Sequence, residues 1–288
     1  MKLCRFDDNR IGVVRDDGVH DVSEIVNELP QVRYPYPMGD QLIANLDRLR
    51  PKMESLADKA KPKTIDQVKF LSPVANPTKV IGTPTNYRAH VAEMSVMRQA
   101  TPSLRSFGSL EEAGLFLKAN SSLVGMSEGV AVRFPDRRTD HEAELGIVFG
   151  KKATDLPVEK AFDCVAGYSM ALDMVVRGPE DRSFRKSIDT YSLLGPWMVT
   201  KDEIKDPDAL EFFLTVNGED RQKANTKDMI MNCANQISWA TRFYTLWPGD
   251  ILMTGTPSGV GRVVPGDTMH FEMQGIGKID IPIRAHKA

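Results

Sequence analysis

The sequence predicts an α+β protein in which strands predominate, with a small N-terminal domain and a larger C-terminal one. Short apolar runs bounded by glycine and proline dominate the chain beyond residue 70, as in AELGIVFG and GDILMTGTPSGVG. This pattern is typical of a compact sheet structure. Only two segments in that part repeat their apolar residues at helical spacing. We therefore expect a mixed, strand-rich fold with few helices.

The N-terminal part has its own pattern. Residues 1–26 alternate short apolar runs with Asp-Asn and Asp-Gly turn signals, which predicts a small antiparallel meander. A polar, helix-prone stretch follows at 41–61, and Pro62 leads into the second region. We place the boundary near residue 70, so the expected domains are 1–70 and 71–288.

The second domain is expected to contain two helices. One runs from about Asn86 to Met97, and the other lies within 225–246, where Asn225 or Thr226 could cap it. The stretch 95–114 has weak periodicity and is expected to form a mobile loop. Loops of this length often act as lids over a binding site.

The bulk composition excludes several classes of function. The chain has 288 residues and a net charge of −2, so it lacks the broad positive field that attracts nucleic acid. It has no apolar run near the roughly 20 residues needed to cross a bilayer, and no signal-peptide pattern. Its three cysteines are scattered, which suits reduced thiols. We expect a cytoplasmic protein that binds neither nucleic acid nor membrane.

The segment DHEAELGIVFG contains the first candidate site. Glu142 and Glu144 are two residues apart on an expected strand, so their side chains project from one face. Asp173 interrupts a second apolar run, CVAGYSMALDMVVRG. Three carboxylates without a matching group of His or Cys ligands favour a hard cation, Mg²⁺ or Mn²⁺, with Ca²⁺ as a further candidate. The alternative is that the two glutamates lie on an edge strand and face water.

A candidate general base lies in NYRAHVAEM. His90 and Glu93 are three residues apart, so on a helix they share a face within hydrogen-bonding reach. A carboxylate in that position orients the imidazole and raises its basicity, which suits the activation of water. The alternative is an ordinary surface pair. His141 points to the opposite face of the acidic strand and is interpreted as a packing or supporting residue.

Further candidates could contact a substrate. Lys186 and Lys118 could bind a substrate carboxylate or steady an oxyanion, although most lysines are simply solvated. The segment GDILMTGTPSGVG brings Gly255 and Thr256 into a glycine-rich loop, where backbone N–H groups can approach a ligand closely. It lacks the Gly-Lys-Ser/Thr ending of a phosphate loop, and a tight turn between strands is the alternative.

With these segments together, the chain resembles the fumarylacetoacetate hydrolase family, from about Lys79 to Ile283. The resemblance rests on blocks in the family's order: KVIGTPTNYRAHVAEM, FLKANSSLVG, DHEAELGIVFG with GYSMALDMVVRG, KSIDTYSLLGPWMVT, and VNGEDRQKANTKDM with PGDILMTGTPSGVG. The branch it resembles contains acylpyruvate hydrolases and hydroxyheptadienedioate isomerases. The resemblance implies a mixed β-rich roll or sandwich with a variable N-terminal domain, assembled as a homodimer.

The resemblance also implies roles for residues of this chain. The family's metal carboxylates match Glu142, Glu144 and Asp173, and its catalytic dyad matches His90 and Glu93. Its active-site lysine matches Lys186, and its substrate-binding threonine matches Thr256.

Four positions depart from the family's usual residues. Pro84 stands where glycine is common, Ala119 where proline is frequent, and Gly178 where aspartate follows the arginine. Glu180 stands where relatives often carry a glutamine that contacts substrate, so its charge could alter which acids bind. These departures affect substrate identity more than reaction class.

The expected activity is divalent-metal-dependent hydrolysis of a C–C bond in a small 2-oxo acid of the acylpyruvate type. In this hypothesis the metal stabilises an enolate, and His90, held by Glu93, activates the attacking water. Isomerisation of a 2-hydroxy-diene diacid and decarboxylation of an oxaloacetate-like acid are enzymatic alternatives. A metal-stabilised binding protein is the non-enzymatic alternative.

Overall fold

The computed structural model describes residues 1–93 and 110–287. Strands predominate and helices are few, which confirms the predicted strand-rich α+β class. The strands form three sheets, and the central one has eleven strands in the order β3-β2-β1-β13-β11-β10-β16-β5-β6, with β4 on β1 and β7 on β13. Its strands are β1 Lys2–Phe6, β2 Arg10–Arg15, β3 Gly18–Asp21, β4 Phe70–Leu71, β5 Val80–Gly82, β6 Phe116–Lys118, β7 Leu123–Gly125, β10 Ala143–Phe149, β11 Val165–Asp173, β13 Ser192–Thr200 and β16 Ile251–Met253.

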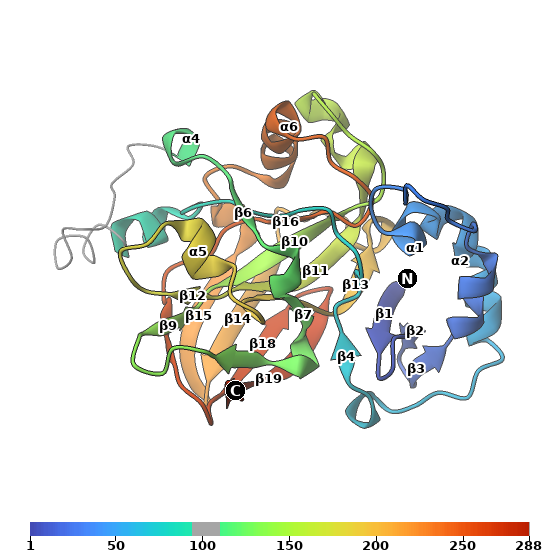
Figure 1. Cartoon of the computed structure of the whole chain (residues 1–288), viewed down its shortest axis with the longest axis horizontal. Helices are drawn as coiled ribbons and strands as arrows, with labels where there is room; N and C mark the ends of the chain where they lie inside the picture. The colour runs from blue at the N-terminus through green and yellow to red at the C-terminus, as the bar shows by residue number, and fades with distance from the viewer. Residues whose placement is uncertain (94–109, 288) are drawn as a thin grey trace.

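Two smaller sheets lie beside the central one (Figure 1). The five-stranded sheet has the order β15-β14-β18-β19-β8, formed by β8 Val130–Val132, β14 Glu211–Val216, β15 Glu219–Asn225, β18 Thr268–Met273 and β19 Gly277–Ala285. The three-stranded sheet has the order β12-β9-β17, formed by β9 Thr139–His141, β12 Val175–Val176 and β17 Gly261–Val263.

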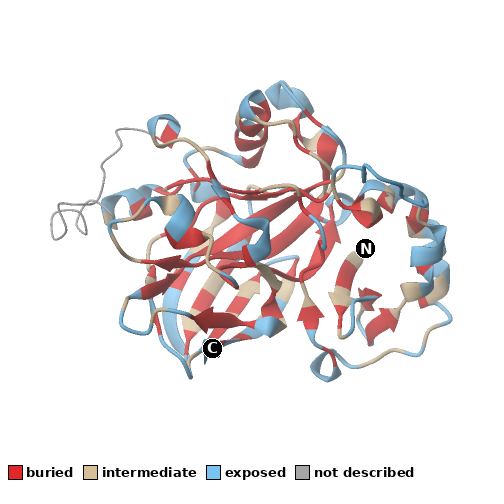
Figure 2. Cartoon of the chain, in the orientation of Figure 1, coloured by how far each residue is buried: buried red, intermediate tan, exposed pale blue. Residues whose placement is uncertain are grey.

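The helices are short and lie at the outside of the sheets, and Figure 2 shows that each carries both buried and exposed residues. They are α1 Gln41–Ala44, α2 Leu46–Ala57, α4 Leu110–Ala113, α5 Arg182–Lys186 and α6 Cys233–Phe243, together with a helical segment at 88–93. The 3₁₀ helices are η1 Ser23–Glu28, η2 Ile65–Gln67, η3 Asn120–Ser122, η4 Met126–Glu128, η5 Val158–Cys164, η6 Lys201–Glu203 and η7 Thr226–Asp228. No helix in the described part of the chain is long and apolar enough to span a membrane.

The N-terminal residues form the predicted antiparallel meander, β1-β2-β3, and the helix-prone stretch forms α1 and α2 beside it (Figure 1). Strand β1 also pairs with β13, so the meander extends the central sheet. Apolar side chains of the meander, such as Leu3 and Ile11, share one buried cluster with Val148 and Leu194 of the larger sheet region. The division at residue 70 stays a prediction.

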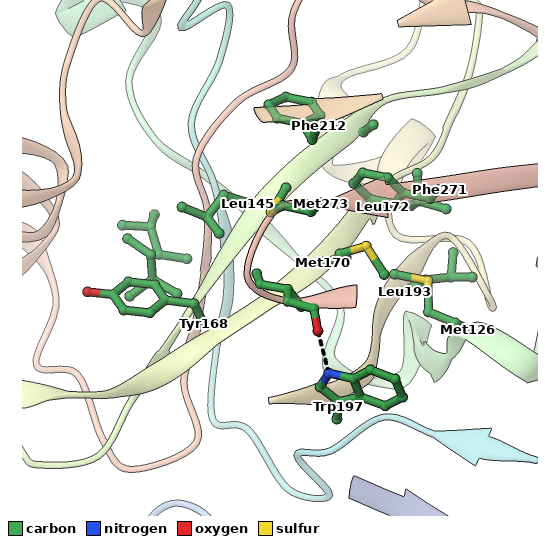
Figure 3. Close-up of a cluster of buried hydrophobic side chains, with 14 of the residues drawn as sticks. Met126, Leu145, Tyr168, Met170, Leu172, Leu193, Trp197, Phe212, Phe271 and Met273 are labelled. Atoms are coloured by element: carbon green, nitrogen blue, oxygen red, sulfur yellow. Dashed lines mark hydrogen bonds between the residues drawn. The ribbon is translucent and has the colours of Figure 1, made fainter. Parts of the chain in front are cut away.

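The main core lies between the central and five-stranded sheets (Figure 3). Strand β10 is buried along all seven residues, which explains why its sequence is apolar on both faces. Trp197 packs edge-on against Phe70, with ring centroids 5.5 Å apart, and its indole N–H donates to the carbonyl of Ile276 at 2.7 Å. The core therefore joins β4, β13 and the β18–β19 turn.

The predicted helix within 225–246 is shorter than expected, and the proposed caps were wrong for it. Asn225 caps only the 3₁₀ turn η7, and α6 begins at Cys233 behind Asn232, whose side chain accepts from Asn235 N at 2.9 Å. The intervening residues are held by Asn86, which accepts from the backbone N–H groups of residues 230 and 231. This tertiary contact overrides the helical periodicity.

The helix predicted from Asn86 to Met97 begins at residue 88, because Asn86 is engaged with other segments. Its last residues, and most of the expected loop at 95–114, lie outside the described residues. The end of that stretch forms α4 instead of continuing as loop.

Candidate active site

Glu144 and Asp173 lie in strands of the central sheet, and Glu142 lies directly before one of them, β10. Each offers one carboxylate oxygen, and these atoms lie within 4.8 Å of one another. Antiparallel pairing of the start of β10 with the end of β11 brings them together, since Glu144 faces Ala171 and the Asp173 N–H donates to Glu142 O at 2.9 Å. The three residues are 6%, 2% and 1% exposed. The alternative of an edge strand facing water was therefore wrong.

Two lysines partly neutralise this carboxylate cluster. Lys186 Nζ donates to Glu142 Oε2 at 2.7 Å and to Asp173 Oδ2, while Lys118 Nζ donates to Asp173 Oδ1 and to Tyr191 O at 2.7 Å. The carboxylates of Asp173 and Glu142 raise the pKa of Lys186 even though burial opposes this. Burial lowers the pKa of Lys118. Both predicted lysines thus contact acidic residues of the cluster.

Burial and neighbouring charges also shift the pKa values of Asp173 and Glu144. Burial disfavours the ionised form of Asp173, but Lys118 and Lys186 outweigh it and lower its pKa. Burial and the neighbouring Asp173 charge raise the pKa of Glu144 well above its ordinary value. Among the described residues Glu144 pairs with no lysine or arginine and accepts only from the Gly255 backbone N–H, and an unpaired buried charge is costly. An all-oxygen donor set of this kind fits a hard divalent cation.

The side chains of His90 and Glu93, predicted to share a helix face, are in hydrogen-bonding contact. His90 Nδ1 lies 2.7 Å from Glu93 Oε2, and the His90 side chain is buried. The second oxygen of Glu93 accepts from Gly259 N at 3.0 Å. Burial opposes ionisation of Glu93, but the hydrogen bonds from His90 and Gly259 lower its pKa. A fixed carboxylate keeps the imidazole proton on Nδ1, which leaves the Nε2 lone pair to accept a proton.

The loop that follows β16 connects the dyad with the carboxylate cluster. Gly255 N donates to Glu144 Oε2 at 2.7 Å, and Gly259 N donates to Glu93 from the same loop. Both glycines have positive φ, 97° and 94°, and a Cβ on Gly259 would lie 1.9 Å from Arg221 O. The backbone N–H groups of this loop, which were predicted to approach a ligand closely, therefore donate to carboxylates of the protein.

Thr256 belongs to a buried hydrogen-bond network. Its hydroxyl donates to Ala143 O at 2.9 Å and accepts from Gln222 Nε2 at 2.7 Å. Gln222 Oε1 in turn accepts from Ala143 N, at 2.9 Å, and lies 3.0 Å from His141 Nδ1. Burial lowers the pKa of His141, and its ring lies beside Gln222 as a supporting residue. The Thr256 hydroxyl retains one lone pair for a further partner.

Glu180 does not carry an unpaired charge. Arg137 donates to both its oxygens, at 3.0 and 2.7 Å, and this interaction lowers the pKa of Glu180. A Cβ at Gly178 would lie 2.0 Å from Arg137 Nη2 and 2.5 Å from Glu180 Oε2. The two departures at Gly178 and Glu180 are thus structurally linked, because the missing side chain at one makes room for the ion pair of the other.

Several residues near the site were not predicted. Arg177 donates to Asp140 at 2.7 Å and to Glu142 at 3.3 Å, and so links the buried Asp140 to the carboxylate cluster. Gln222 and Arg185 are likewise buried in this region. Asp140 stands in the acidic segment itself, so its charge next to two glutamates was a usable signal. Gln222 gave none, because it lies on β15 among exposed polar residues.

A strand-rich fold with buried carboxylates and an adjacent His–Glu pair defines a class of metal-dependent enzymes. Residues 79–284 match the family described as Fumarylacetoacetate (FAA) hydrolase C-terminal. This chain belongs to the fumarylacetoacetate hydrolase family, which confirms the resemblance seen in the sequence.

Three similar proteins extend the comparison. The maleylpyruvate hydrolase of Aquipseudomonas alcaligenes is 50% identical over 286 residues, covering 99% of this chain and 100% of that protein. The crystal structure of maleylpyruvate hydrolase from Sphingobium sp. SYK-6, in complex with manganese(II) and pyruvate, is 35% identical with a TM-score of 0.83 and covers 100% of both chains. The 5-carboxymethyl-2-hydroxymuconate delta-isomerase of Mycobacterium smegmatis is 26% identical with a TM-score of 0.72, again over 100% of both chains.

Proposed function

We propose that this protein is a divalent-metal-dependent hydrolase that cleaves an acylpyruvate into pyruvate and a carboxylic acid. The single observation that carries the proposal is that one loop contacts both the buried carboxylate cluster, through Gly255, and the His90–Glu93 dyad, through Gly259. Similarity to two maleylpyruvate hydrolases, one crystallised with manganese and pyruvate, supports the reaction class.

In this proposal Glu142, Glu144 and Asp173 hold Mg²⁺ or Mn²⁺, with Ca²⁺ as a further candidate. Their mutual distances within 4.8 Å and their all-oxygen donor set support the assignment. When bound, the ion supplies positive charge that favours the enolate form of a 2-oxo acid leaving group. Gly255 N–H orients one of these carboxylates by donating to Glu144.

His90 acts as the general base. Its Nδ1 proton is held by Glu93, so Nε2 takes a proton from a water molecule, which then attacks the acyl carbonyl carbon. Cleavage of the neighbouring C–C bond leaves the electron pair on the methylene carbon, which becomes the methyl group of pyruvate once a proton is returned. Water enters the released acid, so the atoms balance without any oxidant or reductant.

The other predicted residues have supporting roles. Lys186 and Lys118 balance the negative charge of the cluster and position its oxygens, and Lys186 also polarises the substrate carbonyl. Thr256 uses the remaining lone pair of its hydroxyl toward the substrate. Glu180 acts through its backbone and its ion pair with Arg137, not through a free carboxylate.

The proposal includes a cytoplasmic homodimer. All three cysteines are free and buried, which is compatible with a reducing compartment. Light scattering after size-exclusion chromatography measures the assembly directly, and a single mass near 32.1 kDa would contradict the dimer.

An isomerase is the second candidate, favoured by the similarity to the Mycobacterium smegmatis isomerase. Isomerisation uses the same enolate but needs no attacking water. The experiment that separates the two is to incubate the protein and Mn²⁺ or Mg²⁺ with an acylpyruvate, oxaloacetate and a hydroxymuconate-type acid, and to identify products by mass spectrometry. Formation of pyruvate from the acylpyruvate supports the hydrolase. The hydrolase would be contradicted if the acylpyruvate were not cleaved and the protein only isomerised the hydroxymuconate-type acid, without a change of mass, or only removed carbon dioxide from oxaloacetate.

A further inference from the structure

Arg185 differs from the other guanidinium groups around the site. Its side chain is buried, with the residue 9% exposed, and Nε donates to Glu180 O at 2.8 Å. Among the described residues it forms no ion pair. By contrast Arg177 pairs with Asp140, and Arg137 pairs with Glu180. A buried cation without a carboxylate partner is costly unless a ligand supplies the anion.

The position of Arg185 relates it to the carboxylate cluster. It directly precedes Lys186 in α5, and Lys186 contacts Glu142 and Asp173. Burial and then the like charge of Arg177 lower the pKa of Arg185, while the carboxylate of Glu142 acts in the opposite direction. Arg185 is thus a buried residue next to one that contacts the acidic cluster, yet it takes no part in the ion pairs of that cluster.

The surroundings hold Arg185 in place. Its Nε is fixed by Glu180 O, and the Glu180 side chain is held in a bidentate contact by Arg137, for which Gly178 leaves room. The Nε edge of the guanidinium is thus anchored to the backbone. Its two terminal nitrogens retain donors in the paired geometry that suits a carboxylate.

We propose that Arg185 binds the distal carboxylate of a dicarboxylic 2-oxo acid whose 2-oxo carboxylate end occupies the site of Glu142, Glu144 and Asp173. This inference rests on the proposed function for the placement of that chelating end. It deepens the proposed function by naming the residue that recognises a second carboxylate on the acyl group of the acylpyruvate. It also assigns the selectivity between diacids and monoacids to one side chain.

The test compares two ligands that differ only at the distal end, 2-oxoheptanedioate and 2-oxoheptanoate. Their affinities for Mn²⁺-loaded protein are measured by calorimetry for the wild type and for Arg185→Met. We expect the wild type to prefer the diacid at least tenfold. The variant should lose about 10-fold to 100-fold in affinity for the diacid, because a charged hydrogen bond is removed, while its affinity for the monoacid stays within twofold.

Matched variants complete the experiment. Arg133→Met removes an arginine whose ion pair with Asp189 is at the surface, and should change neither affinity. Arg185→Lys keeps the charge and should retain part of the preference. Arg185→Gln keeps a donor toward Glu180 O and replaces the methionine variant if that variant does not fold.

Two results would overturn the inference. One is a wild type that binds the diacid no more tightly than the monoacid. The other is an Arg185 variant that keeps the preference or weakens both ligands equally, as a purely structural role would. Because the readout is binding, it is independent of turnover. A protein that shows the Arg185-dependent preference but cleaves no acylpyruvate would contradict the proposed hydrolase alone.

Discussion

Lys118 offers a test of the charge balance around the carboxylate cluster. Its side chain is fully buried, and Nζ contacts Asp173 and the carbonyl of Tyr191. Substitution Lys118→Met keeps a side chain of similar length and removes the charge. Asp173 then retains Lys186 as its remaining lysine partner, and the Tyr191 carbonyl loses a donor.

The size of the expected loss of stability follows from the buried groups that lose Lys118 as a partner. Leaving a buried hydrogen-bond acceptor without its donor typically costs about 1–3 kcal/mol, and Lys186 still compensates the charge of Asp173. In chelator we therefore expect the free energy of unfolding to fall by about that amount. The same change leaves three carboxylates with one lysine, so a divalent cation is bound more tightly, by at least about tenfold, because the charge it meets is more negative.

Denaturant unfolding in chelator and Mn²⁺ titration calorimetry measure the two effects. Lys205→Met, which removes an exposed lysine, is the control and should change neither. With saturating Mn²⁺ the stability of the Lys118 variant should recover, because binding to the folded state alone stabilises it. Unchanged stability in chelator, or weaker Mn²⁺ binding by the variant, would refute the reasoning.

Three further predictions test the dyad, the core and the thiols. His90→Ala should lower kcat by about 10²–10⁴-fold while Mn²⁺ affinity measured by calorimetry stays nearly the same, and an unchanged rate would remove His90 from the mechanism. Gly277→Ala should lower the free energy of unfolding by about 1–3 kcal/mol, because its Cβ would lie 2.5 Å from the Trp197 ring. Gly218→Ala also places alanine at a positive φ, but its Cβ meets nothing within 4 Å, so it should cost less and the difference measures the clash. Burial raises the pKa of the Cys164 thiol to about 11, and also raises the pKa of the Cys4 and Cys233 thiols, so at pH 8 the folded protein should resist iodoacetamide until denaturant is added. Rapid labelling without denaturant, seen by mass spectrometry, would contradict the buried placement.

Much of the site could be predicted from local sequence because its strands are buried. Glu142, Glu144 and Asp173 stand within or beside runs that are apolar on both faces, so any charge there needs a partner. The His90–Glu93 spacing was equally local. These contacts depend on strand and helix periodicity, which a sequence displays directly.

The remainder depends on contacts between distant segments. Asn86 holds the residues before α6 and so shortens a helix whose periodicity began earlier. Lys118 and Lys186 were interpreted as substrate ligands, yet both contact the acidic cluster, since β6 and α5 meet the end of β11 only in the folded chain. Glu180 looked like a free charge because its partner Arg137 is 43 residues away. Periodicity carries no information about such pairs.

The most direct test of the account is cleavage of an acylpyruvate by protein stripped of metal and then supplied with Mn²⁺, compared with Glu144→Gln treated in the same way. The account predicts no cleavage in chelator, release of pyruvate and the carboxylic acid in equal amounts once Mn²⁺ is added, and little or no cleavage by the variant at the same concentration. Cleavage at the full rate by stripped protein, or an undiminished rate in the variant, would contradict it.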